Sequence, residues 1–97
     1  MNIKILKLGS GDDIISNIEE KDEEIILNNP ARLMMFPTEE GGMGMGLVPW
    51  CPYTDKETFT INSLHVITMF DAPEELSNEY NKQFGSGIVT PPTSIIV

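Results

Sequence analysis

Two sharp turns separate three short apolar segments between Ile3 and Phe36, and this spacing limits the fold more than any other feature of the chain. The first turn, Gly9–Asp13, combines glycines, which adopt positive φ freely, with aspartates, which tolerate it. The second turn, residues 20–23, is entirely charged. Apolar segments of this length joined by such turns predict an antiparallel meander with strands at residues 3–8, 14–19 and 25–36.

The strands are expected to be strongly bent. The apolar phase changes between Ile5 and Leu6, which indicates a bulge or a sharp bend in the first strand. Pro30 cannot donate to a strand ladder, so it marks an edge or a bend in the third strand. One face of that third strand is predicted to carry Ile25, Leu27, Ala31, Leu33 and Met35.

The middle of the chain is less regular. Residues 37–46 contain four glycines and are predicted to form a mobile loop. Prolines at 49 and 52 interrupt residues 47–53, which we interpret as an irregular or edge strand. Residues 58–61 alternate, with Phe59 and Ile61 facing inward, and residues 64–70 predict the fifth and last strand.

A helix is predicted after the last strand, over residues 72–85. Asp71 is a suitable N-cap, and Glu74 three residues later completes a capping box. Lys82 complements the C-terminal dipole, and Gly85 ends the helix. One apolar stripe is expected to pack on the sheet: Leu76, Tyr80 and Phe84.

These elements predict one domain over residues 1–97. A mainly β barrel would occupy residues 1–71, the helix residues 72–85, and an extended tail residues 86–97, where two prolines forbid helix. The apolar ends of the tail predict docking on its own barrel or on a neighbour. Five short antiparallel strands form a small, strongly bent barrel of the SH3-like or OB-like kind.

Charge and composition restrict the function. Fifteen acidic residues against six basic ones give a net charge of −9, which disfavours DNA because non-specific nucleic-acid affinity depends on basic side chains. A local RNA site that depends on stacking stays open. The single cysteine, Cys51, fits a reducing cytoplasm, and no apolar run is long enough to span a bilayer. We therefore expect a cytoplasmic protein without a membrane partner.

The turn spacing resembles the two-part signature of Sm-like proteins. The first motif is matched by Leu8, Gly11, Ile14, Ile18 and Asp22, and the second by Ile61, Val66 and Met69. Ser16 replaces the family's second glycine and keeps its small size. The base-reading asparagine of the family falls at Glu24 or Ile26, and Asn62-Ser63 stands in place of Arg-Gly.

The resemblance implies a five-stranded Sm-like barrel that assembles into a homo-oligomeric ring and binds single-stranded RNA. The RNA contacts would come from Asn62, Ser63 and His65 in one turn and from Lys21 in the other. The alternative is a protein-interaction or scaffolding ring without RNA, which the missing arginine and asparagine favour. The arrangement is also similar to that of a family abundant in marine cyanophage, which would place the protein in the cytoplasm of an infected bacterium.

Other motifs have simpler interpretations. We expect no enzyme activity, because nothing places His65 beside Cys51 as a catalytic pair. No metal or other cofactor is expected, because the acidic run 19–24 lacks the ligand spacing of a calcium loop and is interpreted as a solvated hairpin. Trp50 and Tyr53 can stack on bases, but they are more often core or interface anchors.

Overall fold

The computed structural model describes residues 2–85, and this part of the chain forms six strands followed by a helix. The fold is mainly β, antiparallel and strongly bent, as predicted, but with six strands in place of five. The strands are β1 (Ile3–Leu8), β2 (Asp13–Lys21), β3 (Glu24–Pro37), β4 (Met43–Pro49), β5 (Thr58–Asn62) and β6 (Val66–Asp71). A 3₁₀ turn, η1 (Ser63–His65), joins β5 to β6, and α1 (Glu74–Tyr80) continues into a π-helical turn, η2 (Asn81–Gly85).

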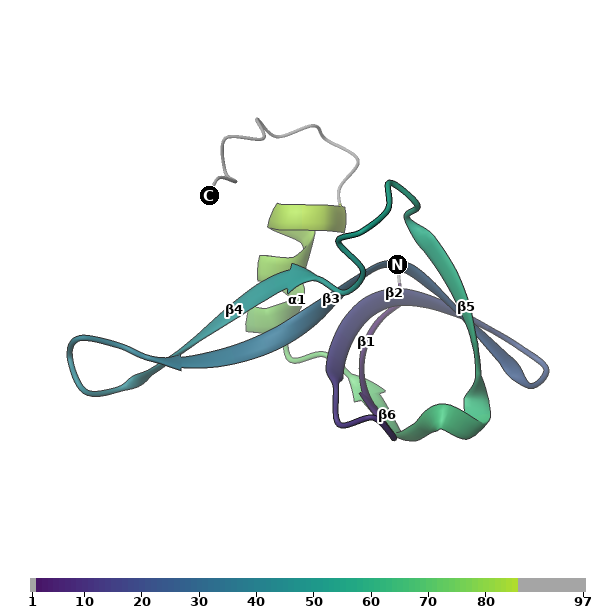
Figure 1. Cartoon of the computed structure of the whole chain (residues 1–97), viewed down its shortest axis with the longest axis horizontal. Coiled ribbons are helices and arrows are strands. Elements are labelled where there is room, and N and C mark those ends of the chain that lie inside the picture. Colours follow the sequence, from purple (N-terminus) through teal and green to yellow (C-terminus); the bar gives the residue numbers. More distant parts are fainter. Residues whose placement is uncertain (1, 86–97) are drawn as a thin grey trace.

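The long strand β3 connects two parts of the molecule. The sheet order is β4-β3-β2-β1-β6, and β5 pairs with β3 on the edge that β4 also uses. The first half of β3, residues 24–28, pairs with β5, and its second half, residues 31–37, pairs with β4. In Figure 1, β1, β2, β5 and β6 curl around the barrel, while β3 and β4 project away from it as a two-stranded arm, residues 31–49.

A bulge separates the two halves of β3. The register with β2 shifts between Ile15 and Asn17, so that Asn29 and Pro30 lie opposite the single residue Ser16. Asn29 has φ = 50°, in the left-handed region, which asparagine tolerates better than most residues. An extra residue bends a strand and increases its local twist. The bend predicted at Pro30 is therefore present.

The sheet is buried on both faces, by two separate cores. The barrel interior contains Leu6, Leu8, Ile14, Ile18, Ile25 and Leu27, and Phe59 and Ile61 pack against it. The second core lies between the sheet and the helix and contains Ile5, Ile15, Ala31, Leu47 and Tyr80, with Leu76 and Phe84 packed against it. The helical stripe thus packs as predicted. Ile5 and Leu6 are both apolar because Ile5 faces the second core and Leu6 faces the barrel interior, and this explains the break in the apolar alternation of β1.

The prediction of a loop over residues 37–46 is wrong for its second half. Only residues 38–42 turn, where the Gly42 amide donates to Thr38 Oγ1 at 3.1 Å, and Met43 already begins β4. Across the arm, the Phe36 ring covers two glycines of β4: a Cβ added to Gly44 would lie 2.6 Å from Phe36 Cε1. The glycines are therefore strand residues that make room for an aromatic ring from the neighbouring strand.

The start of the helix also differs from the prediction. Asp71 is the last residue of β6 and forms an ion pair with Lys4 across the β1–β6 ladder, at 2.7 Å. The N-cap is Pro73, which makes no side-chain capping bond, so the predicted capping box does not form. Leu64 and His65 belong to η1, so the last strand starts two residues later than predicted. The tail predicted at residues 86–97 lies outside the described residues.

Candidate nucleic-acid interface

The two turns that carry the predicted contact residues lie side by side. Lys21 pairs with Glu24 across β2 and β3, and Glu24 pairs in turn with Asn62 of β5. Beyond this register, the Ser63 amide donates to the Glu23 carbonyl oxygen at 2.8 Å. Residues forty positions apart in the sequence therefore share one end of the barrel.

The local conformation of each turn follows from its sequence. Lys21 and Glu24 close a two-residue hairpin in which Asp22 has φ = 55°, a conformation that aspartate tolerates. In η1, the Asn62 side-chain oxygen accepts the Leu64 amide at 2.8 Å and so acts as the N-cap. This bond leaves the exposed amide NH₂ of Asn62 as the part of the side chain that can face a ligand.

The η1 turn is held at both ends by backbone hydrogen bonds. Ser63 contacts the β2–β3 turn, and the carbonyl oxygen of His65 accepts the Gly9 amide of the β1–β2 turn at 2.8 Å. Both ends are thus fixed to the barrel, while the His65 side chain is exposed and Ser63 is half-buried. A histidine ring presented in this way can stack on a base, and the hydroxyl can bond to a base edge.

The charge around Lys21 is unfavourable for phosphate. Five exposed acidic residues flank it on the same hairpin: Glu19, Glu20, Asp22, Glu23 and Glu24. The register places differently the two residues that the sequence left open for the family's base-reading position. Glu24 opens β3 opposite Asn62, whereas Ile26 lies further along the strand opposite Thr60. Of the two, the Glu24 carboxylate, which only accepts hydrogen bonds, is the one that lies opposite Asn62.

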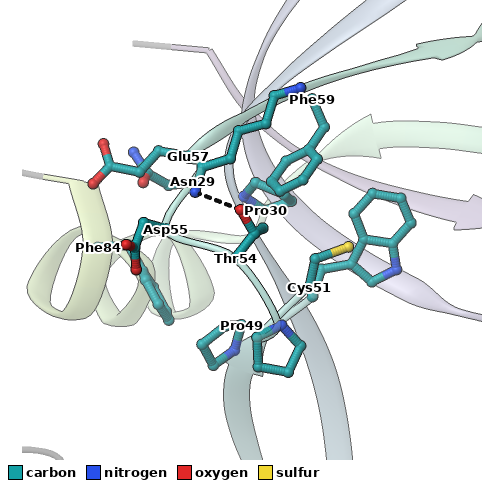
Figure 2. A pocket seen from close by; sticks show the side chains of 12 residues that line it. Asn29, Pro30, Pro49, Cys51, Thr54, Asp55, Glu57, Phe59 and Phe84 are labelled. Carbon is teal, nitrogen blue, oxygen red and sulfur yellow. Dashed lines mark hydrogen bonds between the residues drawn. The ribbon is translucent and has the colours of Figure 1, made fainter.

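Apart from the turns, a hollow of about 290 Å³ lies at the end of the arm nearest the barrel and is shown in Figure 2. Trp50 and Phe59 line it and meet edge to face, with ring centroids 5.9 Å apart. The indole Nε1 donates to Asp12 at 3.4 Å, which fixes the ring at the edge of the barrel core. Tyr53, in contrast, is 92% exposed. Of the two aromatic residues considered for stacking, Trp50 is a packing residue and only Tyr53 presents its ring to solvent.

Sequence reasoning missed two features of this region. Cys51 and Lys56 line the same hollow, and Lys56 Nζ lies 5.7 Å from the centroid of the Phe59 ring, a cation–π geometry. No spacing in the sequence signals this contact, because the loop between β4 and β5 has no periodic pattern. Within residues 2–85, no group of three or more His, Cys, Asp or Glu side chains is placed to hold a metal ion.

The fold defines a class of protein: a small, strongly bent antiparallel barrel with a 3₁₀ turn between its last two strands. A family model for the Sm_like domain matches residues 5–81. The match covers all six strands, apart from the first two residues of β1, and the whole of α1. The chain belongs to the Sm-like family. Sm-like proteins are generally non-enzymatic and typically assemble into oligomeric rings. No curated protein matches the chain. Of the helical segments within residues 2–85, none has the length and apolarity needed to cross a membrane.

Proposed function

We propose that this protein is a non-enzymatic Sm-like ring that holds a short stretch of single-stranded RNA on its paired turns. The hydrogen bond between the Ser63 amide and the Glu23 carbonyl carries the proposal, because it brings four candidate contact residues to one end of the barrel. These residues are Lys21, Asn62, Ser63 and His65. They supply an amide, a hydroxyl, an aromatic ring and one positive charge, which suit unstacked bases better than a duplex backbone.

Ring assembly is supported by strands that are paired on one edge only, among them β5 and β6. Within the described residues, β5 pairs only with β3, and β6 pairs only with β1. Large apolar side chains are exposed on and beside β6: Leu64 is 85% exposed, Ile67 67% and Phe70 48%. An apolar edge strand in an isolated subunit favours pairing with another strand. We expect β6 of one subunit to pair with β5 of the next, closing a ring on the order of five to seven subunits.

We also propose that such a ring acts in the cytoplasm, and specifically in an infected bacterium if the protein is encoded by a phage.

A protein-interaction or scaffolding ring is the second candidate. It is favoured by the five acidic residues around Lys21 and by the position of the Glu24 carboxylate opposite Asn62. Both features repel phosphate.

Assembly is tested by light scattering after gel filtration at micromolar concentration. The unmodified protein should elute as a closed oligomer, and Ile67→Lys should shift it towards monomer by placing a charge in the subunit contact. Met34→Lys, an equivalent change on the arm, is the matched control and should leave the mass unchanged. A monomeric unmodified protein would contradict the ring.

RNA binding is tested with short labelled uridine-rich and adenine-rich oligonucleotides at low salt. Binding to one of them should weaken in Asn62→Ala and should be retained in Asn78→Ala, a matched change on α1 away from the turns. If neither oligonucleotide binds while the ring is intact, the scaffolding candidate is correct.

A further inference from the structure

One face of the arm is apolar along its whole length. The register places Leu33 opposite Leu47, Met35 opposite Met45 and Pro37 opposite Met43, so these six side chains share a face. Nearest the barrel, Leu33 and Leu47 pack in the core beneath the helix. Further out, the face continues with Met35, Met43 and Met45, which are 56%, 62% and 46% exposed. We call these three residues the methionine face.

A groove opens where the methionine face meets the start of the helix. It has a volume of about 540 Å³ and is lined by Met45, Pro73, Glu74, Glu75 and Leu76. Three of its five lining residues are apolar, and the other two, Glu74 and Glu75, are exposed. Methionine side chains are flexible and polarisable, so the apolar part of the groove adapts to apolar side chains of different shape.

Negative charge stands at both ends of the methionine face. Glu74 and Glu75 lie at the groove, and Glu39 and Glu40 lie in the turn at the tip of the arm. The single basic residue of the arm, Arg32, pairs with Val48 and so belongs to the opposite face. The strand rise puts the two acidic pairs on the order of 15 Å apart, which is about three turns of an α-helix.

We infer that the groove and the methionine face form a docking site for a basic amphipathic helix of a partner protein. Leucine-like side chains of that helix would enter the groove over Met45 and Leu76. Lysine or arginine residues at its two ends would lie beside Glu39–Glu40 and Glu74–Glu75. The charge pattern selects this partner over a second copy docked through the same face, because that copy would bring its own Glu39–Glu40 and Glu74–Glu75 against these acidic pairs. The site is on the arm, away from the turns proposed to bind RNA.

The probe is a synthetic peptide of about three helical turns made of Leu and Lys in an amphipathic pattern, labelled for fluorescence anisotropy. The full-length protein should bind it, and a peptide with Glu in place of Lys should not bind. Glu74→Gln with Glu75→Gln should weaken binding about tenfold, because two charge pairs at the groove are lost. Glu19→Gln with Glu20→Gln removes the same charge from the turn hairpin and should change the affinity by less than about twofold.

The apolar part is tested by Met43→Thr with Met45→Thr, which keeps β propensity and removes the flexible side chains. This variant should also weaken binding about tenfold, whereas Met34→Thr on the opposite face should not. Equal loss in the Glu19/Glu20 variant would show general attraction to an acidic protein and would overturn the inference. The inference would also be overturned if the Met43/Met45 variant dissociated an oligomer, because the methionine face would then be a contact with a second copy. Displacement of the probe by a free peptide of residues 86–97 would overturn it as well, in favour of the chain's own segment.

Discussion

The hydroxyl of Tyr80 donates to the carbonyl oxygen of Asn28 at 2.8 Å and thereby joins the helix to the bend of β3. The same hydroxyl lies 3.0 Å from the Asn29 carbonyl oxygen and accepts the Asn17 amide at 3.3 Å. Ser16 Oγ also donates to the Asn28 carbonyl, at 2.9 Å. A bulge interrupts the strand ladder and leaves backbone groups that need other partners. Two buried hydroxyls supply those partners here, so the helix and the bend stabilise each other.

Replacing Tyr80 separates the two contributions of this side chain. Tyr80→Phe keeps the ring in the second core but removes the hydroxyl, and should lower the free energy of unfolding by about 1–3 kcal/mol because backbone groups at the bulge lose a partner. Tyr80→Ala removes the ring as well and should cost about 3–5 kcal/mol. Denaturant unfolding of both variants measures the difference. No loss in Tyr80→Phe would mean that the hydroxyl contributes nothing, and equal losses in the two variants would mean that the ring contributes nothing.

Tyr80 should also make the fold sensitive to alkali. Burial raises the pKa of Tyr80 above its ordinary value of 10.0, and the hydrogen bond from the Asn17 amide opposes that rise only in part. As the pH rises above about 10, the unfolded chain releases this proton while the folded chain retains it, so the stability falls. The melting temperature of the unmodified protein should therefore decrease more steeply than that of Tyr80→Phe between about pH 9 and pH 11. Parallel curves would contradict this, since lysines titrate equally in both proteins.

The helical stripe could be predicted from the sequence, but the partners of its central residue could not. A four-residue spacing identifies Tyr80 as a buried position. Its hydrogen bonds depend on the bulge at Asn29 and Pro30, which is a matter of register between strands and leaves no periodic signal. The helix start was mispredicted for a similar reason. Asp71 has the right spacing to Glu74 for a capping box, yet it pairs with Lys4 in the β1–β6 ladder and so belongs to the sheet.

The arm shows how composition misleads. Glycines at 41, 42, 44 and 46 indicate a loop when they are considered alone. Gly44 and Gly46 are nevertheless strand residues, because Phe36 of the paired strand lies over them. For the candidate site, motif spacing identified both turns. The pairing of Glu24 with Asn62, which puts a carboxylate into the site, required the strand register.

The contact between Phe36 and Gly44 predicts that the effect of Gly44→Ala on stability changes sign when Phe36 is removed. Gly44→Ala should destabilise the protein by about 1 kcal/mol, since the added Cβ would lie 2.6 Å from Phe36 Cε1 and the ring must leave its place. In a Phe36→Ala background the same substitution should stabilise by about 0.5–1 kcal/mol, because the clash is gone and alanine reduces the entropy of the unfolded chain. Unfolding of the four proteins gives the coupling. Gly42→Ala, where the nearest atom is 3.7 Å away, is the control and should be well tolerated.

The ion pair of Lys4 with Asp71 should contribute little. The Lys4 side chain is 23% exposed and that of Asp71 is 84% exposed, so water and salt screen their attraction. Asp71→Ala should therefore cost less than about 1 kcal/mol, and the loss should shrink at high salt. A double-mutant cycle with Lys4→Ala checks that the effect comes from this pair. If Asp71→Ala costs the same at low and high salt, and in the presence or absence of Lys4, the loss would point instead to a role of Asp71 in starting the helix.

RNA binding, if it occurs on the turns, should depend weakly on salt. Lys21 is surrounded by five acids, so few phosphates can be neutralised and the slope of log affinity against log salt should be small. Stacking on one aromatic ring contributes about 1–3 kcal/mol per base, and His65→Ala should weaken binding by that amount. Lys21→Glu should weaken it further by repelling phosphate, whereas Lys82→Glu on η2 makes the same charge change away from the turns and should matter less. Anisotropy titrations at several salt concentrations measure all three. A steep slope together with a silent His65→Ala variant would show that RNA contacts a different, basic surface, and that the paired turns are not the site.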